Sequence, residues 1–290
     1  MKKLIWILIF FPVSAIAGLF DIDLVYRVYS LDKPAPTIIV GHHCGGSIGH
    51  SDDWARQLNK WGFNAVNLDS FTPRKITNEC EWGRLPAPYR AEETYDMAEF
   101  IKKQPWHQGK IGYIGFSHGG STAVFIASDR RNKNIDAVVA FYPYCGKWGN
   151  TQISSSSPNT KLMLALGKRD DWTPYLPCMG EDKNLEIHLY ENATHAFDQQ
   201  FPGWTSRYLN YYMEHDRQAN IDSRIATRIF FKKYLEGMIE GDGVARAEFV
   251  KTVLEPPAKS KRTALDDLPE IREPTEEDVR AYEKKQKPKK

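Results

Sequence analysis

A serine flanked by glycines, at the junction of an apolar run and a segment of small residues, constrains this chain more than any other feature. The sequence from Gly115 to Gly119 reads GFSHG, which has the form G-x-S-x-G; it follows the apolar run Ile111–Ile114 and precedes a predicted helix over Gly119–Ser128. A turn this sharp leaves no room for Cβ atoms beside the serine, so glycines flank it. The serine hydroxyl is then held at a helix N-terminus, which favours developing negative charge. The motif predicts Ser117 as a nucleophile.

Apolar runs typical of strands alternate with segments of helical periodicity over most of the chain. Predicted strands cover Leu24–Tyr29, Thr37–Val40, Phe63–Leu68, Ile111–Gly115, Ala137–Tyr142, Leu162–Leu166 and Leu185–Tyr190. Predicted helices cover Ser51–Trp61, Ala91–Lys103, Gly119–Ser128 and Ile221–Met238. Continuous apolar strands that alternate with helices indicate an α/β fold, with a mostly parallel, doubly wound sheet and helices on both faces. Residues that follow the strands should meet at one edge, where ligands bind in such sheets.

The first 17 residues have the layout of a secretory signal peptide. Lys2 and Lys3 precede an apolar stretch from Leu4 to Ala17, which ends in small residues before Gly18. That stretch, about 14 residues long, is shorter than the ~20 residues needed to span a bilayer. We expect cleavage near Ala17-Gly18 and export to the periplasm or the extracellular space, with no membrane span in the mature chain. An uncleaved anchor and a buried first helix are the alternatives.

Residues 244–290 are expected to form a charged, largely disordered tail. From Glu255 to Lys290, 19 of 36 residues are Asp, Glu, Lys or Arg. Such a segment buries too little apolar surface to offset its ordering entropy. The last seven residues hold five lysines, for which a solubilising role is favoured over weak contact with an anionic surface. Residues 18–243, between the two ends, form the predicted catalytic domain.

The charge balance argues against nucleic acid as a partner. The chain has 39 Lys+Arg and 37 Asp+Glu, and removal of the two signal-peptide lysines leaves 37 bases and 37 acids, a net charge of zero. A protein that binds nucleic acid usually has a strongly basic domain. A chain this long buries roughly 70–75% of its unfolded surface, so the core needs no metal or disulfide. The sequence leaves the oligomeric state open.

A serine hydroxyl needs a base, and the G-x-S-x-G fold predicts the order Ser, then Asp or Glu, then His. Asp170 and Asp171 follow the sixth predicted strand, and His195 follows the seventh. His195 would accept the Ser117 proton and return it to the leaving group, while the aspartate would hold the imidazole in the correct tautomer. The two adjacent aspartates are equal candidates on this argument.

Two backbone N–H groups are needed to bind the oxyanion that forms when a nucleophile attacks a carbonyl. One belongs to the residue after the nucleophile, which is His118. The other belongs to a loop after an earlier strand, here the glycine-containing loop from Gly41 to Gly46. Cys44 is our candidate for that second donor.

Four further side chains that follow strands are candidates for the substrate pocket. Arg74 could hold a substrate carboxylate in a bidentate contact, or form a structural salt bridge with a loop acid. Phe71, Tyr144 and Trp172 would line an aromatic pocket, although plain packing is the commoner role of aromatic side chains.

Four cysteines follow strands at the same predicted edge, in a chain expected to reach an oxidising compartment. Four cysteines allow three pairings. The pairs Cys44–Cys80 and Cys145–Cys178 each join loops that follow consecutive strands, and we predict these two bridges. Buried free thiols, which behave as small hydrophobic groups, are the alternative.

Together these segments resemble the dienelactone hydrolase family of the α/β-hydrolase superfamily, over about residues 35–235. The resemblance rests on the segments His42–Gly46, Asp69–Arg74, Gly115–Gly120, Tyr142–Cys145, Gly167–Pro174 and His195–Asp198. It implies an α/β-hydrolase fold with little or no cap domain, no metal, no cofactor, and small lactones or carboxylic esters as substrates. It also implies that the acid is Asp170, three residues after Gly167.

The chain departs from the family pattern at two positions. The namesake enzymes use a cysteine nucleophile where this chain has Ser117, which favours an ordinary ester hydrolase over the specific lactone chemistry. Relatives with a similar glycine loop usually have glycine where this chain has His43. The larger His43 side chain would narrow the pocket or alter the oxyanion loop; a loop histidine that faces solvent is the alternative. We expect an exported serine hydrolase. An acyltransferase, a peptidase or a catalytically silent binding protein are the alternatives.

Overall fold

The computed structural model describes residues 24–47, 49–81, 85–146, 160–199 and 204–237. The expected signal peptide (residues 1–17) and the expected charged tail (residues 244–290) lie outside the described residues. The proposed domain boundaries at residues 18 and 243 lie outside them as well.

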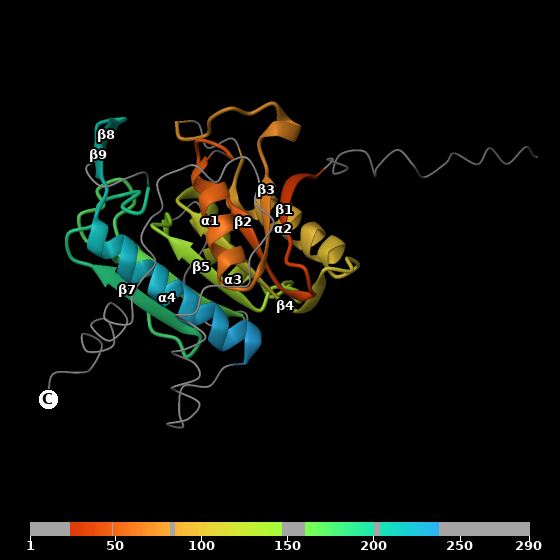
Figure 1. Cartoon of the computed structure of the whole chain (residues 1–290). Helices are drawn as coiled ribbons and strands as arrows, with labels where there is room; N and C mark the ends of the chain where they lie inside the picture. Colours follow the sequence, from red (N-terminus) through yellow and green to blue (C-terminus); the bar gives the residue numbers. More distant parts are fainter. Residues whose placement is uncertain (1–23, 48, 82–84, 147–159, 200–203, 238–290) are drawn as a thin grey trace, which may run out of the picture.

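A seven-stranded sheet forms the centre of the molecule (Figure 1). Its strands lie in the order β1-β3-β2-β4-β5-β6-β7. β2 to β7 run parallel to one another, and β1 pairs antiparallel with β3 at one edge. The predicted mostly parallel α/β sheet is therefore confirmed. The strands are β1 Val25–Tyr29, β2 Ala35–Gly41, β3 Asn64–Asp69, β4 His107–Phe116, β5 Ala137–Phe141, β6 Lys161–Gly167 and β7 Leu185–Tyr190.

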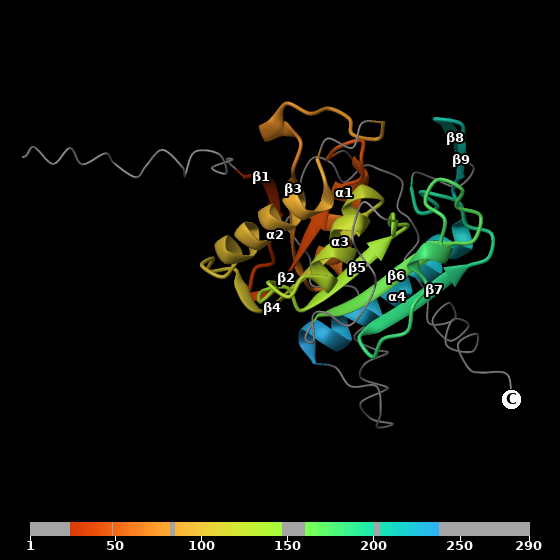
Figure 2. The same ribbon diagram turned by 180° about the vertical axis from the view of Figure 1, so that it is seen from behind.

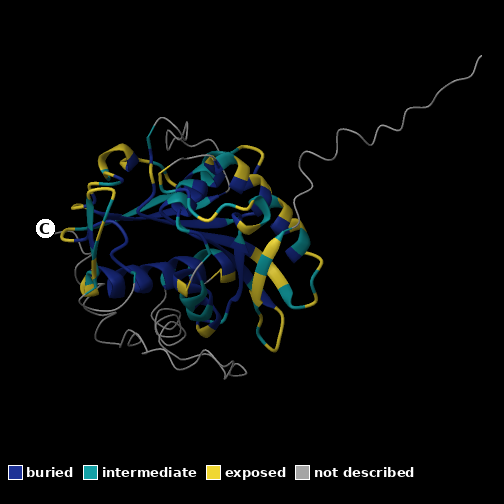
Figure 3. Cartoon of the chain, turned by 90° about the horizontal axis from the view of Figure 1, so that it is seen from above, coloured by how far each residue is buried: buried dark blue, intermediate teal, exposed yellow. Residues whose placement is uncertain are grey.

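Helices cover both faces of the sheet. The first and last helices pack on the face seen in Figure 1, and the two middle helices pack on the face seen in Figure 2. Viewed from above, the buried strands lie between these helix layers (Figure 3). The helices are α1 Gly49–Lys60, α2 Ala87–Ile101, α3 His118–Ser128 and α4 Arg217–Glu236.

The apolar run of β2 shows why its sequence does not alternate. Ile38 and Val40 pack in the layer of α1 and α4, whereas Ile39 packs in the layer of α2 and α3. Successive side chains of a strand point to opposite faces. A strand between two helix layers therefore needs apolar side chains on both faces, as a continuous run provides.

Three elements begin four residues earlier in the chain than their apolar patterns predict. α2 begins at Ala87, and Pro88 lies in its first turn, where proline is tolerated because its missing N–H has no partner within the helix. β4 begins at His107, four residues before its buried run, and its first residues are polar and largely exposed. α4 begins at Arg217, where the Asp216 side chain accepts a hydrogen bond from the backbone N–H of Ala219. Apolar periodicity indicates the buried part of a helix or strand and misses the polar residues with which it begins.

The two-stranded hairpin of β8 (Thr205–Tyr208) and β9 (Tyr211–Glu214) was not predicted. Its two turn residues, Leu209 and Asn210, have φ of 48° and 69°. Two positive φ values define the tight turn that matches strand twist, which Asn-Gly or Asp-Gly usually forms. Leu-Asn carries no such signal. The hairpin projects beyond the sheet near the end of β7 (Figure 1).

Both predicted disulfides are present. Cys44 is bonded to Cys80, and Cys145 is bonded to Cys178. Each bridge joins loops at the carboxyl edge of the parallel strands, where the predicted site residues also lie. Within the described residues, no helix combines the length and hydropathy needed to cross a membrane.

Removing the Cys145–Cys178 bridge should destabilise the protein without changing its fold. The two cysteines are separated by 33 residues, and closing a loop of that length restricts the unfolded chain by about 3–4 kcal/mol in the chain-entropy model. The double variant Cys145→Ser, Cys178→Ser should therefore unfold at a lower urea concentration, with the free energy of unfolding reduced by about 3 kcal/mol. Urea titration followed by tryptophan fluorescence measures this. An unchanged midpoint would contradict the expectation.

Candidate active site

The turn between β4 and α3 holds Ser117 in a backbone conformation that few residues adopt. Ser117 has φ 50° and ψ −109°. A Cβ atom at Gly115 would lie 2.0 Å from the backbone oxygen of Gly119, and one at Gly119 would lie 2.2 Å from that of Gly41. Neither position accepts a side chain, as the G-x-S-x-G spacing predicts. Such strained positions persist where the surrounding structure fixes the backbone, and they cluster at active sites.

Ser117, His195 and Asp170 form a continuous chain of hydrogen bonds. Ser117 Oγ lies 3.0 Å from His195 Nε2, and His195 Nδ1 lies 2.8 Å from Asp170 Oδ2. All three residues are buried, with exposed fractions of 8%, 3% and 5% respectively. The adjacent Asp171 is exposed. The structure thus places Asp170, rather than Asp171, against the imidazole.

The Asp170 carboxylate is oriented by its own loop. Its Oδ1 accepts hydrogen bonds from the backbone N–H groups of Trp172, at 3.0 Å, and Thr173, at 2.8 Å. The hydroxyl of Thr173 lies 2.8 Å from Asp170 Oδ2 and 3.0 Å from His195 Nδ1. Sequence reasoning missed Thr173, although an Asp that accepts from residues two and three positions later is a recognisable turn signal.

Aromatic rings surround the imidazole of His195. The ring centroid of Tyr142 lies 4.7 Å from that of His195, and the ring of Trp172 lies 4.9 Å from it. Trp172 also stacks on Tyr208 and Tyr211 of the unpredicted hairpin, with centroids 5.7 Å and 5.2 Å apart. Trp172 is therefore at the site, and the hairpin contributes to its surroundings.

Of the other predicted pocket residues, Arg74 and Phe71 contact neighbouring side chains and Tyr144 is exposed. Arg74 forms an ion pair with Glu93 of α2, which fits the salt-bridge alternative, except that the acid lies on a helix. Phe71 is buried against His42, with ring centroids 4.4 Å apart, so it packs within the protein. Tyr144 is 42% exposed, and no described ring packs against it.

His43 is only partly accessible and does not project freely into solvent. Its Nδ1 accepts a hydrogen bond from the backbone N–H of Gly45 at 2.9 Å, so the proton of the neutral ring lies on Nε2. Within the described part of the chain, Nε2 is buried and has no hydrogen-bond partner. Burial, with the nearby His50 and His195, lowers the pKa of His43 to about 3.

A second buried carboxylate, Asp198, lies beneath the site. It accepts hydrogen bonds from His50 Nε2 at 2.9 Å, Trp54 Nε1 at 2.8 Å and the Tyr142 hydroxyl at 2.7 Å. Burial by itself raises the pKa of this carboxyl, but His50 and the hydrogen bonds outweigh burial and lower the pKa to about 2. Because Tyr142 packs on His195, this network supports one side of the site. The sequence gives no local signal for it, since His50 and Asp198 are 148 residues apart.

The ionised form of Asp198 should contribute to stability above pH 4 and not near pH 2. Its pKa is about 2 in the folded protein and about 3.9 in an unfolded chain, so the difference is worth about 2 kcal/mol, which is lost as pH falls through the folded pKa. Asp198→Asn cannot ionise. Its stability deficit relative to the wild type should therefore shrink by about 2 kcal/mol between pH 5 and pH 2.

Urea unfolding at the two pH values measures this deficit. Asp171→Asn, at an exposed position, is the control and should show no comparable change. Equal deficits for Asp198→Asn at both pH values would contradict the expectation.

The chain is similar to known proteins of one hydrolase family. A model of the dienelactone hydrolase family matches residues 25–235. A carboxymethylenebutenolidase from Pseudomonas putida is 22% identical over 185 residues, which cover 57% of this chain and 75% of that relative. A carboxymethylenebutenolidase from Pseudomonas knackmussii matches with the same figures.

Solved structures share the fold. A dienelactone hydrolase-like promiscuous phosphotriesterase from metagenomic libraries superposes with a TM-score of 0.55 at 18% identity, covering 73% of this chain and 93% of that one. A carboxylesterase from Lactobacillus plantarum superposes with a TM-score of 0.52 at 16% identity, covering 75% and 94%. Since the family model matches most of the chain and the fold agrees, the chain belongs to the dienelactone hydrolase family, whose members are hydrolases of the α/β-hydrolase fold.

Proposed function

We propose that this protein is a serine hydrolase that cleaves small carboxylic esters or lactones through an acyl-enzyme. The observation that carries the proposal is the buried hydrogen-bonded chain from Ser117 through His195 to Asp170, with Ser117 on the strained turn before α3. A serine, a base in contact with it and a carboxylate that orients the base are the parts required for nucleophilic catalysis.

In the first half of the proposed reaction, Ser117 Oγ attacks the ester carbonyl carbon while His195 Nε2 takes the hydroxyl proton. The carbonyl oxygen becomes an oxyanion, which the backbone N–H groups of His118 and Cys44 bind. The C–O bond to the leaving group then breaks, and His195 donates its proton to the departing alkoxide. Asp170 keeps the proton of the neutral ring on Nδ1 and stabilises the imidazolium between these steps.

In the second half, water attacks the acyl-enzyme. His195 removes a proton from the water, the same two N–H groups bind the second oxyanion, and the proton returns to Ser117 Oγ as the carboxylic acid leaves. For a lactone the alcohol and the acid remain parts of one molecule, so the product is a hydroxy acid. The two half-reactions together consume only the ester and one water molecule.

Two features support esters or lactones as the substrate class. The curated relatives are named carboxymethylenebutenolidase, and a butenolide is a cyclic ester. The described side chains packed on His195 are the aromatic rings of Tyr142 and Trp172, which suit an uncharged acyl group. Arg74 forms an ion pair with Glu93, so we do not include it as a carboxylate contact in this proposal.

We also propose that the chain is exported. Residues 1–17 have the layout of a signal peptide, and both cysteine pairs are bridged. Structural disulfides persist in oxidising compartments and are rare in the cytosol.

Ser117→Ala should abolish ester turnover. Loss of the nucleophile of a serine hydrolase removes about 10⁴-fold or more of kcat. Hydrolysis of p-nitrophenyl acetate by the purified protein measures this, and a fluorophosphonate probe should label the wild type and not the variant. Ser128→Ala, at the other end of α3, is the matched control and should keep full activity. Retention of activity by Ser117→Ala would rule out the proposal.

Asp170→Asn should lower kcat strongly, whereas Asp171→Asn should not. An amide at position 170 holds His195 in the wrong tautomer, an effect worth about 10⁴-fold in other serine hydrolases. Asp171 is adjacent in sequence but exposed, so its variant should stay within about threefold of the wild type, as expected of surface changes. Steady-state kinetics of the two variants decide between the residues. The opposite ranking would assign the acid to Asp171.

A further inference from the structure

The two N–H groups proposed to bind the oxyanion lie on different segments. His118 is the first residue of α3, and Cys44 lies on the loop after β2. A peptide unit is planar, so the direction of its C=O fixes the direction of the N–H on the other side. A side chain that hydrogen-bonds to a carbonyl of this loop therefore sets the direction of the N–H group in the same peptide unit.

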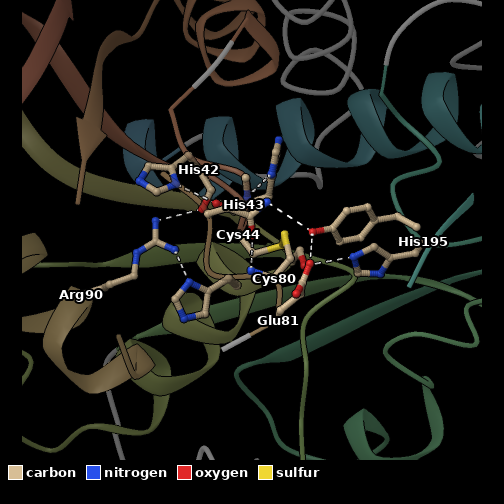
Figure 4. The surroundings of a disulfide bond; sticks show 12 residues. His42, His43, Cys44, Cys80, Glu81, Arg90 and His195 are labelled. Atoms are coloured by element: carbon tan, nitrogen blue, oxygen red, sulfur yellow. Dashed lines mark hydrogen bonds between the residues drawn. A yellow bond between two sulfur atoms is a disulfide. The ribbon is translucent and has the colours of Figure 1, made fainter. Parts of the chain in front are cut away.

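Arg90 of α2 connects three segments around this loop. It is 1% exposed. Its guanidinium donates hydrogen bonds to the backbone oxygen of His42 at 2.9 Å, to Ser70 Oγ at 3.3 Å and to His118 Nδ1 at 3.0 Å. Figure 4 shows Arg90 directed at His42, in the surroundings of the Cys44–Cys80 bridge. One side chain thus holds both the loop and the start of α3.

His42 orients the next peptide unit along the loop. The side chain is fully buried, and its Nε2 accepts a hydrogen bond from the backbone N–H of Ser70 at 3.2 Å. Because a backbone N–H can only donate, the ring proton must lie on Nδ1. His42 Nδ1 lies 2.7 Å from the backbone oxygen of His43 and donates to it. That oxygen belongs to the peptide unit that carries the N–H of Cys44.

Burial, together with the charge of Arg90, keeps both imidazoles neutral. Burial and the adjacent guanidinium lower the pKa of His118 to about 3 and that of His42 well below its ordinary value. A neutral His118 retains the lone pair that accepts from Arg90, and a neutral His42 retains the one that accepts from Ser70. Near neutral pH the network therefore has one arrangement of protons.

The other side of the loop is held independently. The backbone N–H of Glu79 donates to the backbone oxygen of Cys44 at 2.8 Å, and the side chain of Cys44 is bonded to Cys80. These contacts fix where Cys44 lies. The direction of its N–H depends on the preceding carbonyl, which His42 binds.

We propose that Arg90 and His42 are positioning residues of the oxyanion hole: Arg90 joins the loop after β2 to the start of α3, and His42 aims the N–H of Cys44. This inference rests on the proposed function, because the oxyanion exists only if Ser117 attacks a carbonyl.

His42→Asn and His42→Gln separate positioning from general structure. The amide nitrogen of Asn reaches roughly the place of Nδ1 and can donate to the oxygen of His43, whereas that of Gln reaches roughly the place of Nε2. Loss of one oxyanion donor costs about 10²-fold or more in kcat. We therefore expect His42→Gln to lower kcat for p-nitrophenyl acetate about 10²-fold with KM within about threefold, and His42→Asn to recover most of the loss.

Arg90→Met and Arg90→Lys test the connection between the segments. Lysine keeps the charge but lacks the planar fork that reaches several acceptors at once. Both variants should lose about 10²-fold in kcat with KM little changed. Arg224→Met is the matched control, because Arg224 is also buried but lies on α4, over Trp54 on the other face of the sheet. It should lose thermal stability and keep its kcat.

Hydrogen–deuterium exchange tests the inference without using activity. Amides of the peptide that covers residues 42–46 should exchange at least about tenfold faster in Arg90→Met and His42→Gln than in the wild type or in Arg224→Met, because local opening becomes easier. Unchanged exchange in both variants, or a His42→Asn variant as slow in turnover as His42→Gln, would overturn the inference. A wild type that hydrolyses no ester would instead count against the proposed function, while the exchange result would still decide whether these residues order the loop.

Discussion

Backbone contact between the first turn of α3 and the neighbouring strands is the constraint on which the site depends. The backbone oxygen of Gly41 at the end of β2 lies 2.2 Å from where a Cβ atom of Gly119 would be, and that of Gly119 lies 2.0 Å from where one of Gly115 would be. β2, β4 and α3 therefore approach one another as closely as glycine allows. This approach brings the nucleophilic serine, the helix N-terminus and the loop after β2 to the same place, before any side chain makes a specific contact.

The main sheet, the position of Ser117 and the cysteine pairs could be predicted from the sequence. The apolar runs indicated every strand of the main sheet, and the turn glycines indicated the position of Ser117. The order of Asp170 and His195 along the chain followed from the fold class, although the choice of Asp170 over Asp171 needed the family resemblance. The cysteine pairs followed from the order of the strands. The strand and turn signals lie within a few residues of the features that they predict, and the remaining assignments follow from the order of elements in the fold.

The rest depended on contacts between distant segments. Arg90 lies in no motif, the segment that ends at Asp198 indicates no role for its carboxylate, and the partners of the two residues lie 20 to 148 residues away. Both are buried charges whose hydrogen bonds are supplied by several elements, so only the assembled fold shows what they do. For Arg74, its place after a strand left a substrate contact and a structural salt bridge as equal alternatives, and the partner Glu93 is supplied by a helix far from it in sequence. The β8–β9 hairpin was not predicted because its turn is formed by Leu-Asn and lacks the usual Asn-Gly or Asp-Gly signal.

The hairpin has a consequence for how this protein can diverge. Tyr208 and Tyr211 are paired across the two strands, and both stack on Trp172, which in turn packs on His195. Among the residues that the structure describes, the hairpin strands pair with each other and not with the main sheet. Substitutions near the turn of this ribbon, which supplies the contacts with Trp172, alter the surroundings of the imidazole, whereas its base is bound to the residue before His195 through the hydrogen bonds between Glu214 and Thr194. Evolution can therefore vary this side of the site separately from the machinery that the fold must keep constant.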